Sequence, residues 1–192
     1  MRLLRWALKG CYKLNLNKLF QMQKVLDKKI LERFPKLKNE DLLPKKILAL
    51  QVELGELANE WRGFKFWSKN QAPRIIALKG STMNYEYKEF YNPLLEEYVD
   101  GIHFILSIGN DLKIDIREWS IEPFKNKTIL DQFSQTYQVI SDLQYDPNKI
   151  DLVIVLEHFI VLGEMLGFTW LEIEQAYYEK NAINHTRQDN LY

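Results

Sequence analysis

Hydrophobic and polar positions along the chain follow the period of an α-helix rather than that of a β-strand. Glycine and proline, which interrupt helices, are scarce at 8 and 6 residues. No strand is predicted. Five or six helices without a sheet indicate an all-α fold, namely a helix bundle with a four-helix core and additional helices. The predicted helices cover residues 16–34, 44–62, 93–110, 151–166 and 169–187, with a shorter one near 130–143.

Local signals mark where several of these helices begin and end. Pro44 and Pro93 stand in first turns, where the missing backbone N–H has no intrahelical partner to lose. Gly63 is the predicted C-cap of the second helix. Thr169 is followed three residues later by Glu172, which is the signature of a capping box. These signals support the helix limits that the periodicity predicts.

The composition is that of a globular protein, with 46% apolar and 13% aromatic residues. A length of 192 residues favours one domain, here residues 14–192 after an N-terminal extension at 1–13. The 26 basic and 26 acidic residues cancel, whereas binding to a nucleic-acid polymer requires surplus cations. Apolar runs are shorter than the roughly 20 residues of a membrane span, and the single cysteine cannot form an intramolecular disulfide. We therefore expect a cytoplasmic protein that binds neither nucleic-acid polymers nor membranes.

Four carboxylates on two predicted helices form the main candidate site. Glu53 and Glu56 are spaced i, i+3 on the second helix, about 90° from its apolar ridge, so they border the core. Glu97 and Asp100 share one face of the helix over 93–110 with the same spacing. Solvated acidic faces usually carry Lys or Arg at i+3 or i+4, but Glu53 and Glu56 have no such neighbours there. The pattern indicates a metal site, with ordinary surface acids as the alternative.

The type of ligand favours Mg²⁺, which binds a few carboxylates, keeps water molecules and leaves positions for substrate phosphates. Two facing pairs could hold two such ions or more, which would polarise a phosphate and generate hydroxide. No cluster of histidine and cysteine indicates zinc. The glycine-rich phosphate loops and the serine-hydrolase motif are also missing from the sequence.

A polar stripe near the C-terminus adds possible phosphate ligands. Lys180, Asn184 and Arg187 are spaced 4 and 3 residues apart and share a face if the last helix continues through them. Lysine offers a point charge and arginine a planar fork, and both suit phosphate. The alternative is a solvated helix end, where the macrodipole favours cations.

Gln23 interrupts an apolar stripe on the first helix. A buried amide is costly unless it finds a hydrogen-bonding partner. That partner is either another side chain or the amide edge of a base such as uracil, because glutamine both donates and accepts. His103, three residues after Asp100, is placed either to form a hydrogen bond near the site or to serve a structural role.

The amino-acid sequence around these residues resembles a known protein family more specifically. The matching segments are LFQMQKVLDKKI (19–30), ALQVELGELANEWRGFKFWS (49–68), LLEEYVDGIHFILSIG (94–109) and LGFTWLEIEQAYYEKNAINHTRQDN (166–190). Together with the ExxE and ExxD spacing, they resemble the dimeric dUTPases of Gram-positive bacteria and their phages. Those enzymes belong to the all-α nucleoside triphosphate pyrophosphatase superfamily. The resemblance runs from residue 14 to the C-terminus.

The resemblance implies a homodimer that hydrolyses dUTP to dUMP and pyrophosphate with Mg²⁺. The four carboxylates match the metal ligands, and Glu53 is also expected to orient or deprotonate the attacking water. The implied contacts to the nucleotide come from Gln23 for uracil, Phe104 for the deoxyribose, and Lys180, Asn184 and Arg187 for the phosphates. Lys65 and Trp67 are expected to close the site, with a position at the dimer interface as one route.

Two alternatives to a dUTP-specific enzyme stay open at the level of the sequence. A broader (deoxy)nucleoside di- or triphosphate pyrophosphatase, acting also on dCTP or dUDP, would use the same metal cluster with different pocket residues. A helical interaction module without enzymatic activity would use the same acids to bind a basic partner. Release of pyrophosphate that depends on Mg²⁺ distinguishes the module from the enzymes.

Overall fold

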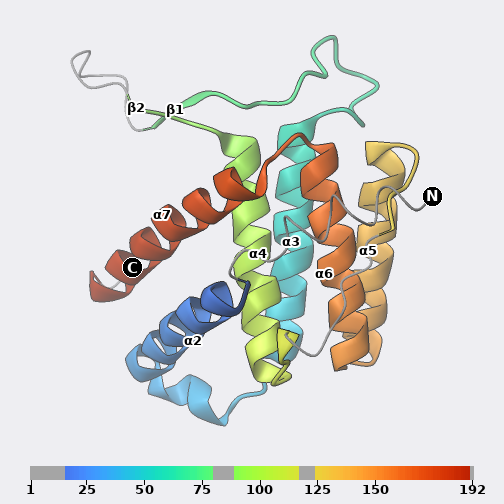
Figure 1. Cartoon of the computed structure of the whole chain (residues 1–192). Helices are drawn as coiled ribbons and strands as arrows, with labels where there is room; N and C mark the ends of the chain where they lie inside the picture. The colour runs from blue at the N-terminus through green and yellow to red at the C-terminus, as the bar shows by residue number, and fades with distance from the viewer. Residues whose placement is uncertain (1–15, 80–88, 117–123, 191–192) are drawn as a thin grey trace.

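The computed structural model describes residues 16–79, 89–116 and 124–190. Within these ranges the chain forms six α-helices, a 3-10 turn and one short hairpin (Figure 1). The elements are α2 (Leu16–Arg33), η1 (Pro35–Asn39), α3 (Leu43–Trp61), β1 (Ala77–Lys79), β2 (Glu89–Tyr91), α4 (Pro93–Asp111), α5 (Ile129–Tyr145), α6 (Lys149–Met165) and α7 (Trp170–Asp189). The all-α prediction is confirmed.

Four helices close a ring around the core. Helix α3 contacts α4 and α5, and α6 contacts the same two helices from the other side. Helices α2 and α7 pack against each other and against α4, on the face of α4 that looks away from α5 (Figure 1). Because α4 has neighbours on both sides, it is buried around most of its circumference. The expected four-helix core with additional helices is therefore present, and α4 is its central member.

Helices α4 and α6 approach closely because glycines face aromatic rings across their interface. A Cβ atom added at Gly101 would lie 2.4 Å from Cζ of Phe159, and one added at Gly163 would lie 2.5 Å from the Tyr98 hydroxyl oxygen. The Tyr98 and Phe159 rings stack with centroids 4.8 Å apart, and the Tyr98 hydroxyl donates to the Phe159 carbonyl oxygen at 3.1 Å. This contact fixes the position of the α4 turn that carries Asp100.

Capping explains most helix limits. Asn92, Thr128 and Asn148 each accept a hydrogen bond from a backbone N–H in the first turn of the helix that follows. The capping box predicted at Thr169 is present.

The C-cap predicted for α3 is wrong. Arg62, with φ of 64°, takes the left-handed conformation in place of Gly63. The Arg62 guanidinium donates to the Asn70 carbonyl oxygen at 2.8 Å, while Gly63 packs so close to the Trp61 ring that a Cβ atom would clash at 2.3 Å. Hydrogen bonding of the arginine side chain and the lack of space at the glycine together favour this arrangement.

The hairpin was not predicted. Strands β1 and β2 pair antiparallel, with Ala77 opposite Tyr91 and Lys79 opposite Glu89. Each strand has only three residues, which is too short to establish an alternating pattern in the sequence.

Arg74 ties the segment between α3 and α4 to both helices. Its backbone N–H donates to the Glu60 carbonyl oxygen at 2.9 Å, and its own carbonyl oxygen accepts from the Leu94 N–H at 3.2 Å. Its guanidinium Nε donates to Glu60 Oε2 at 2.6 Å, and Nη2 pairs with the other carboxylate oxygen. We call this set of contacts the Arg74 bridge. It holds the C-terminal end of α3 beside the N-terminal end of α4.

Among the described helices, none is by itself long and apolar enough to cross a bilayer. Helices α6 and α7 reach that length and apolar character only when taken together, and the pair is bent by 109°.

Candidate functional site

A cavity of about 750 Å³ lies among α2, the segment that follows it, α3, α4 and α7. The segment 37–43, between α2 and α3, contributes several lining residues. The cavity brings together seven of the residues predicted for the site: Gln23, Glu53, Asp100, Phe104, Lys180, Asn184 and Arg187. These residues come from opposite ends of the sequence and from four helices.

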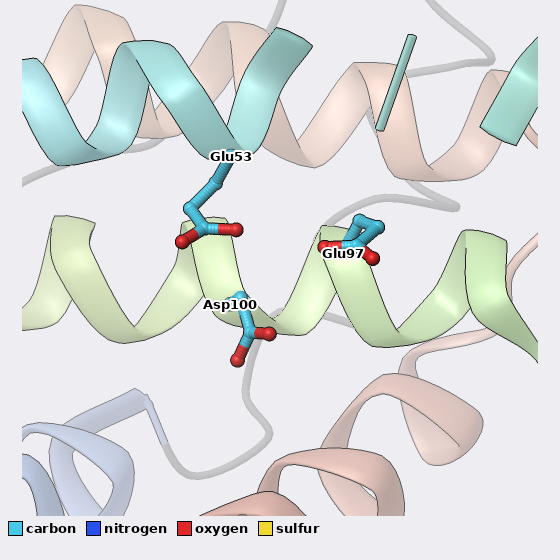
Figure 2. Close-up of side chains that lie close together, drawn as sticks. All are labelled: Glu53, Glu97 and Asp100. Carbon is cyan, nitrogen blue, oxygen red and sulfur yellow. The ribbon is translucent and has the colours of Figure 1, made fainter. Parts of the chain in front are cut away.

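Three carboxylates from two helices converge beside this cavity; Glu53 and Asp100 line it, whereas Glu97 does not. Glu53 extends from α3 toward α4, where Glu97 and Asp100 lie one turn apart (Figure 2). One carboxylate oxygen from each lies within 4.8 Å of the others. Glu56, one turn beyond Glu53, is exposed and is not part of this group of three. Its charge nevertheless acts on both Glu53 and Glu97.

The environment of the three carboxylates disfavours their negative charge. Burial, followed by repulsion from Asp100 and Glu56, raises the pKa of Glu53 to about 7. Burial and repulsion from four neighbouring acids, led by Asp100, raise the pKa of Glu97 to about 8. Burial also raises the pKa of Asp100, although the charge of Lys180 opposes this effect. Mg²⁺ binds carboxylate oxygens in proteins. The three carboxylates supply such oxygens and lack enough positive charge nearby, so they fit that ion.

Lys180 connects α7 to the acidic side of α4. Its Nζ donates to Asp100 Oδ2 at 2.6 Å and to Glu96 Oε1 at 2.7 Å, and its side chain is only 11% exposed. Asn184 and Arg187 follow on the same face of α7, with Arg187 Nη1 donating to Asn184 Oδ1 at 3.4 Å. Helix α7 thus directs two cations and an amide into the cavity that holds the carboxylates, an arrangement suited to a phosphate chain.

Gln23 is buried and hydrogen-bonded inside the chain. Its amide oxygen lies 2.7 Å from His103 Nδ1 and accepts from the Tyr177 hydroxyl at 3.0 Å, while its nitrogen donates to Asp27 Oδ1 at 2.8 Å. Of the two kinds of partner that the sequence left open, the structure supplies the side chains. Gln23 also lines the cavity.

Lys65 and Trp67 do not line this cavity. They follow α3, where the Trp67 ring is 65% exposed and contacts Phe64 and Phe66 edge-on. The expectation that they close the site remains a prediction, because a single copy of the chain places them elsewhere.

Several residues of the cavity were not predicted. Asp27 and Ser107 contact each other at 2.9 Å and line the cavity beside Gln23. Asp27 stands one helical turn after Gln23, so the i, i+4 relation in the sequence was the signal that could have found it. Lys46 and the segment 37–43 carried no comparable signal, since their approach depends on how the chain turns after α2.

Comparison with known protein families identifies a match. A family model described as dUTPase matches residues 15–80 and 83–192, which is most of the chain. Among curated proteins, none matches.

Proposed function

Because the chain belongs to the dUTPase family, we propose that its active site is the cavity lined by Glu53 and Asp100, together with the neighbouring Glu97. The protein is a nucleotide pyrophosphohydrolase, a dUTP diphosphatase that converts dUTP to dUMP and pyrophosphate. Family membership favours this activity over an interaction module without catalysis. At a finer level, we place it with the dimeric dUTPases of Gram-positive bacteria and their phages, in the all-α nucleoside triphosphate pyrophosphatase superfamily.

The observation that carries the proposal is the convergence of three carboxylates from α3 and α4 within 4.8 Å. Glu53, Glu97 and Asp100 would hold Mg²⁺, and Glu56 completes the set from the adjacent turn of α3. Two ions or more are expected, because both helices present a pair of acids. When bound, the metal would polarise the phosphate and acidify the attacking water.

Side chains of the protein would activate the water and bind the phosphates, the sugar and the base. Glu53 would orient the water or accept its proton, because a carboxylate beside the metal can do both. Lys180 and Arg187 would neutralise charge on the phosphates, and Asn184 would add a hydrogen bond. Phe104, which lines the cavity from α4, would pack on the deoxyribose and exclude a 2′-hydroxyl. Gln23 would read the base.

We further propose that the protein is a homodimer and that it is cytoplasmic. The segment around the hairpin exposes a group of large apolar side chains, which commonly marks an interface. Its members are Phe66, Trp67, Ile75, Ile76 and Phe90. A partner subunit covering this group would give Trp67 and Lys65 the role that the resemblance implies.

Release of pyrophosphate from dUTP, followed while Mg²⁺ is titrated, tests the active site. Glu53→Gln removes the charge and the base while keeping the shape of the side chain. We expect activity to fall by about 10²-fold or more, with helical content unchanged by circular dichroism. Glu179→Gln is the control, because Glu179 is an exposed acid of α7 that contacts Gln175. Turnover by Glu53→Gln equal to that of the control would rule out the assignment.

A further inference from the structure

Lys180 lies between two acids of α4 that stand one helical turn apart. Its Nζ donates to Glu96 Oε1 at 2.7 Å and to Asp100 Oδ2 at 2.6 Å. The Lys180 side chain is only 11% exposed, so both bonds are largely shielded from water. A lysine ammonium has three N–H donors, of which these two bonds engage two. The side chain also lines the cavity, so the ammonium is within reach of a ligand there.

The two acids that hold Lys180 differ in what else they face. Asp100 is one of the three carboxylates that converge within 4.8 Å, whereas Glu96 is not part of that group. The Glu96 side chain is 37% exposed, against 18% for Asp100. Glu96 also stands in the first turn of α4, where the helix macrodipole favours a negative charge. Glu96 thus offers Lys180 a carboxylate outside the group of three.

A metal ion held by the three carboxylates would meet the charge of Lys180 at Asp100. Ion and ammonium are both positive and would share this one carboxylate, so they repel each other. Lys180 therefore opposes metal binding for as long as it stays on Asp100. Because Nζ already contacts Glu96, the lysine can give up Asp100 and still keep a counter-ion.

We propose that Glu96 is a positioning residue that holds Lys180 once a metal ion takes over Asp100. In this role Glu96 relieves the competition for Asp100 and keeps the ammonium beside the cavity. Without Glu96, Lys180 has Asp100 as its remaining partner and competes with the metal for it. The proposal rests on the metal and phosphate roles assigned above to Asp100 and Lys180.

A simpler role for Glu96 is that of one more negative charge near the metal. Such a charge would attract a cation whether or not Lys180 is present. A role exerted through Lys180 predicts instead that Glu96 affects metal binding only while the lysine is there. A double-mutant cycle on the two residues separates these roles.

Binding of Mn²⁺ alone, followed by electron paramagnetic resonance, measures this cycle without turnover, since Mn²⁺ also binds carboxylate oxygens. Glu96→Gln should weaken Mn²⁺ binding by roughly tenfold, which is a coupling of ordinary size for residues in contact. Lys180→Met should strengthen binding, because it removes the competing cation. In the Lys180→Met background, Glu96→Gln should change the affinity by less than about threefold. Equal weakening in both backgrounds overturns the proposal.

The chain contains a matched control in an exposed lysine–glutamate pair on α2. Lys28 Nζ lies 3.6 Å from Glu32 Oε1, with both side chains mostly exposed, and neither residue lines the cavity. Glu32→Gln removes one negative charge from a lysine, as Glu96→Gln does. It should leave the affinity for Mn²⁺ unchanged in both backgrounds.

Crystals of the wild type grown with and without Mg²⁺ cover the case in which Lys180→Met does not fold. With Mg²⁺, Nζ of Lys180 should lie within hydrogen-bond distance of Glu96 and no longer of Asp100. An ammonium that stays on Asp100, or that leaves Glu96, overturns the proposal. Hydrolysis of dUTP without coupling in the cycle contradicts only the role of Glu96. Coupling without hydrolysis of dUTP upholds that role and contradicts the proposed function instead.

Discussion

Lys180 compensates the carboxylates of the site unequally. It contacts Asp100 directly and lowers the pKa of that acid relative to the effect of burial, and it acts on Glu53 only through space. All the influences on Glu97 raise its pKa, and the largest is burial. The ionised forms of Glu97 and Glu53 are therefore the least compensated by nearby positive charge. A divalent cation gains most by binding there.

His103 allows a test at the same scale, because its pKa depends on burial. The folded pKa of about 3 lies below the unfolded value near 6.5, so the unfolded chain binds more protons between these limits. The contribution of His103 to stability is therefore present above pH 6.5 and is lost as the pH falls. We expect the free energy of unfolding of the wild type, relative to His103→Asn, to fall by about 1 kcal/mol per pH unit below pH 6.5.

Urea unfolding of both proteins at about pH 5, 6, 7 and 8 measures this difference. The acids with raised pKa values act in the opposite direction, but both proteins contain them, so their effect cancels in the comparison. A difference that stays constant across the acidic part of this range would contradict a neutral, buried His103.

At the scale of the element, the contact between α4 and α6 leaves no room for a methyl group. In Gly101→Ala the added Cβ atom would lie 2.4 Å from the Phe159 ring, and the stacking of that ring on Tyr98 keeps it there. We expect this variant to lose roughly 1–2 kcal/mol of stability, as overpacking outweighs the better helix propensity of alanine.

Gly55→Ala is the matched comparison within α3. Its added Cβ would lie 3.1 Å from the Tyr137 hydroxyl, the far end of a half-buried side chain that can shift. We expect stability to stay the same or rise by up to about 1 kcal/mol. Chemical denaturation of both variants measures the effect, and equal stabilities would show that the α4–α6 interface can adjust.

Helices were predictable from the sequence because their causes are local. The start of α7 follows from the Thr169 capping box, and the burial of Gln23 follows from its place in an apolar stripe. The cap at Arg62 depends on a hydrogen bond to Asn70, eight residues away, which no helix signal contains. The hydrogen bond between Asp27 and Ser107 depends on how α2 packs on α4. Periodicity can place each residue on a helix face, but it cannot show which residue of another helix it contacts.

At the scale of the whole molecule, the site is assembled from four helices. How these helices pack against one another cannot be deduced from the spacing of residues along the sequence. The sequence placed Glu53 and Asp100 on helix faces, and the packing of α3 on α4 brings them together. The family resemblance implied that Lys180 contacts a phosphate of the substrate. In the fold, Lys180 lies against Asp100. Four predicted site residues do not line the cavity: Glu56 and Glu97, which lie next to the carboxylates that do, and Lys65 and Trp67, which follow α3.

The proposed dimer is tested through the exposed apolar group near the hairpin. Phe66 and Trp67 are 85% and 65% exposed. Replacing both with serine should weaken self-association, because burial of such side chains drives most interfaces. We expect analytical ultracentrifugation to show a dimer for the wild type and a shift toward monomer for the double variant. Tyr145→Ser, on the end of α5, is the control, and an unchanged dimer in both variants would exclude this surface.

The Arg74 bridge has a consequence for how this protein can change over evolution. By bonding to Glu60 and Leu94, Arg74 joins the two helix ends directly, so residues 75–79 and 89–92 are not needed to hold these ends together. Lengthening such a loop costs little, about 0.6 kcal/mol per doubling. Insertions or deletions there would be absorbed without moving Glu53 relative to Glu97. Changes of length between these residues are therefore expected to leave the acidic site intact, even where they alter the proposed dimer surface at Ile75, Ile76 and Phe90.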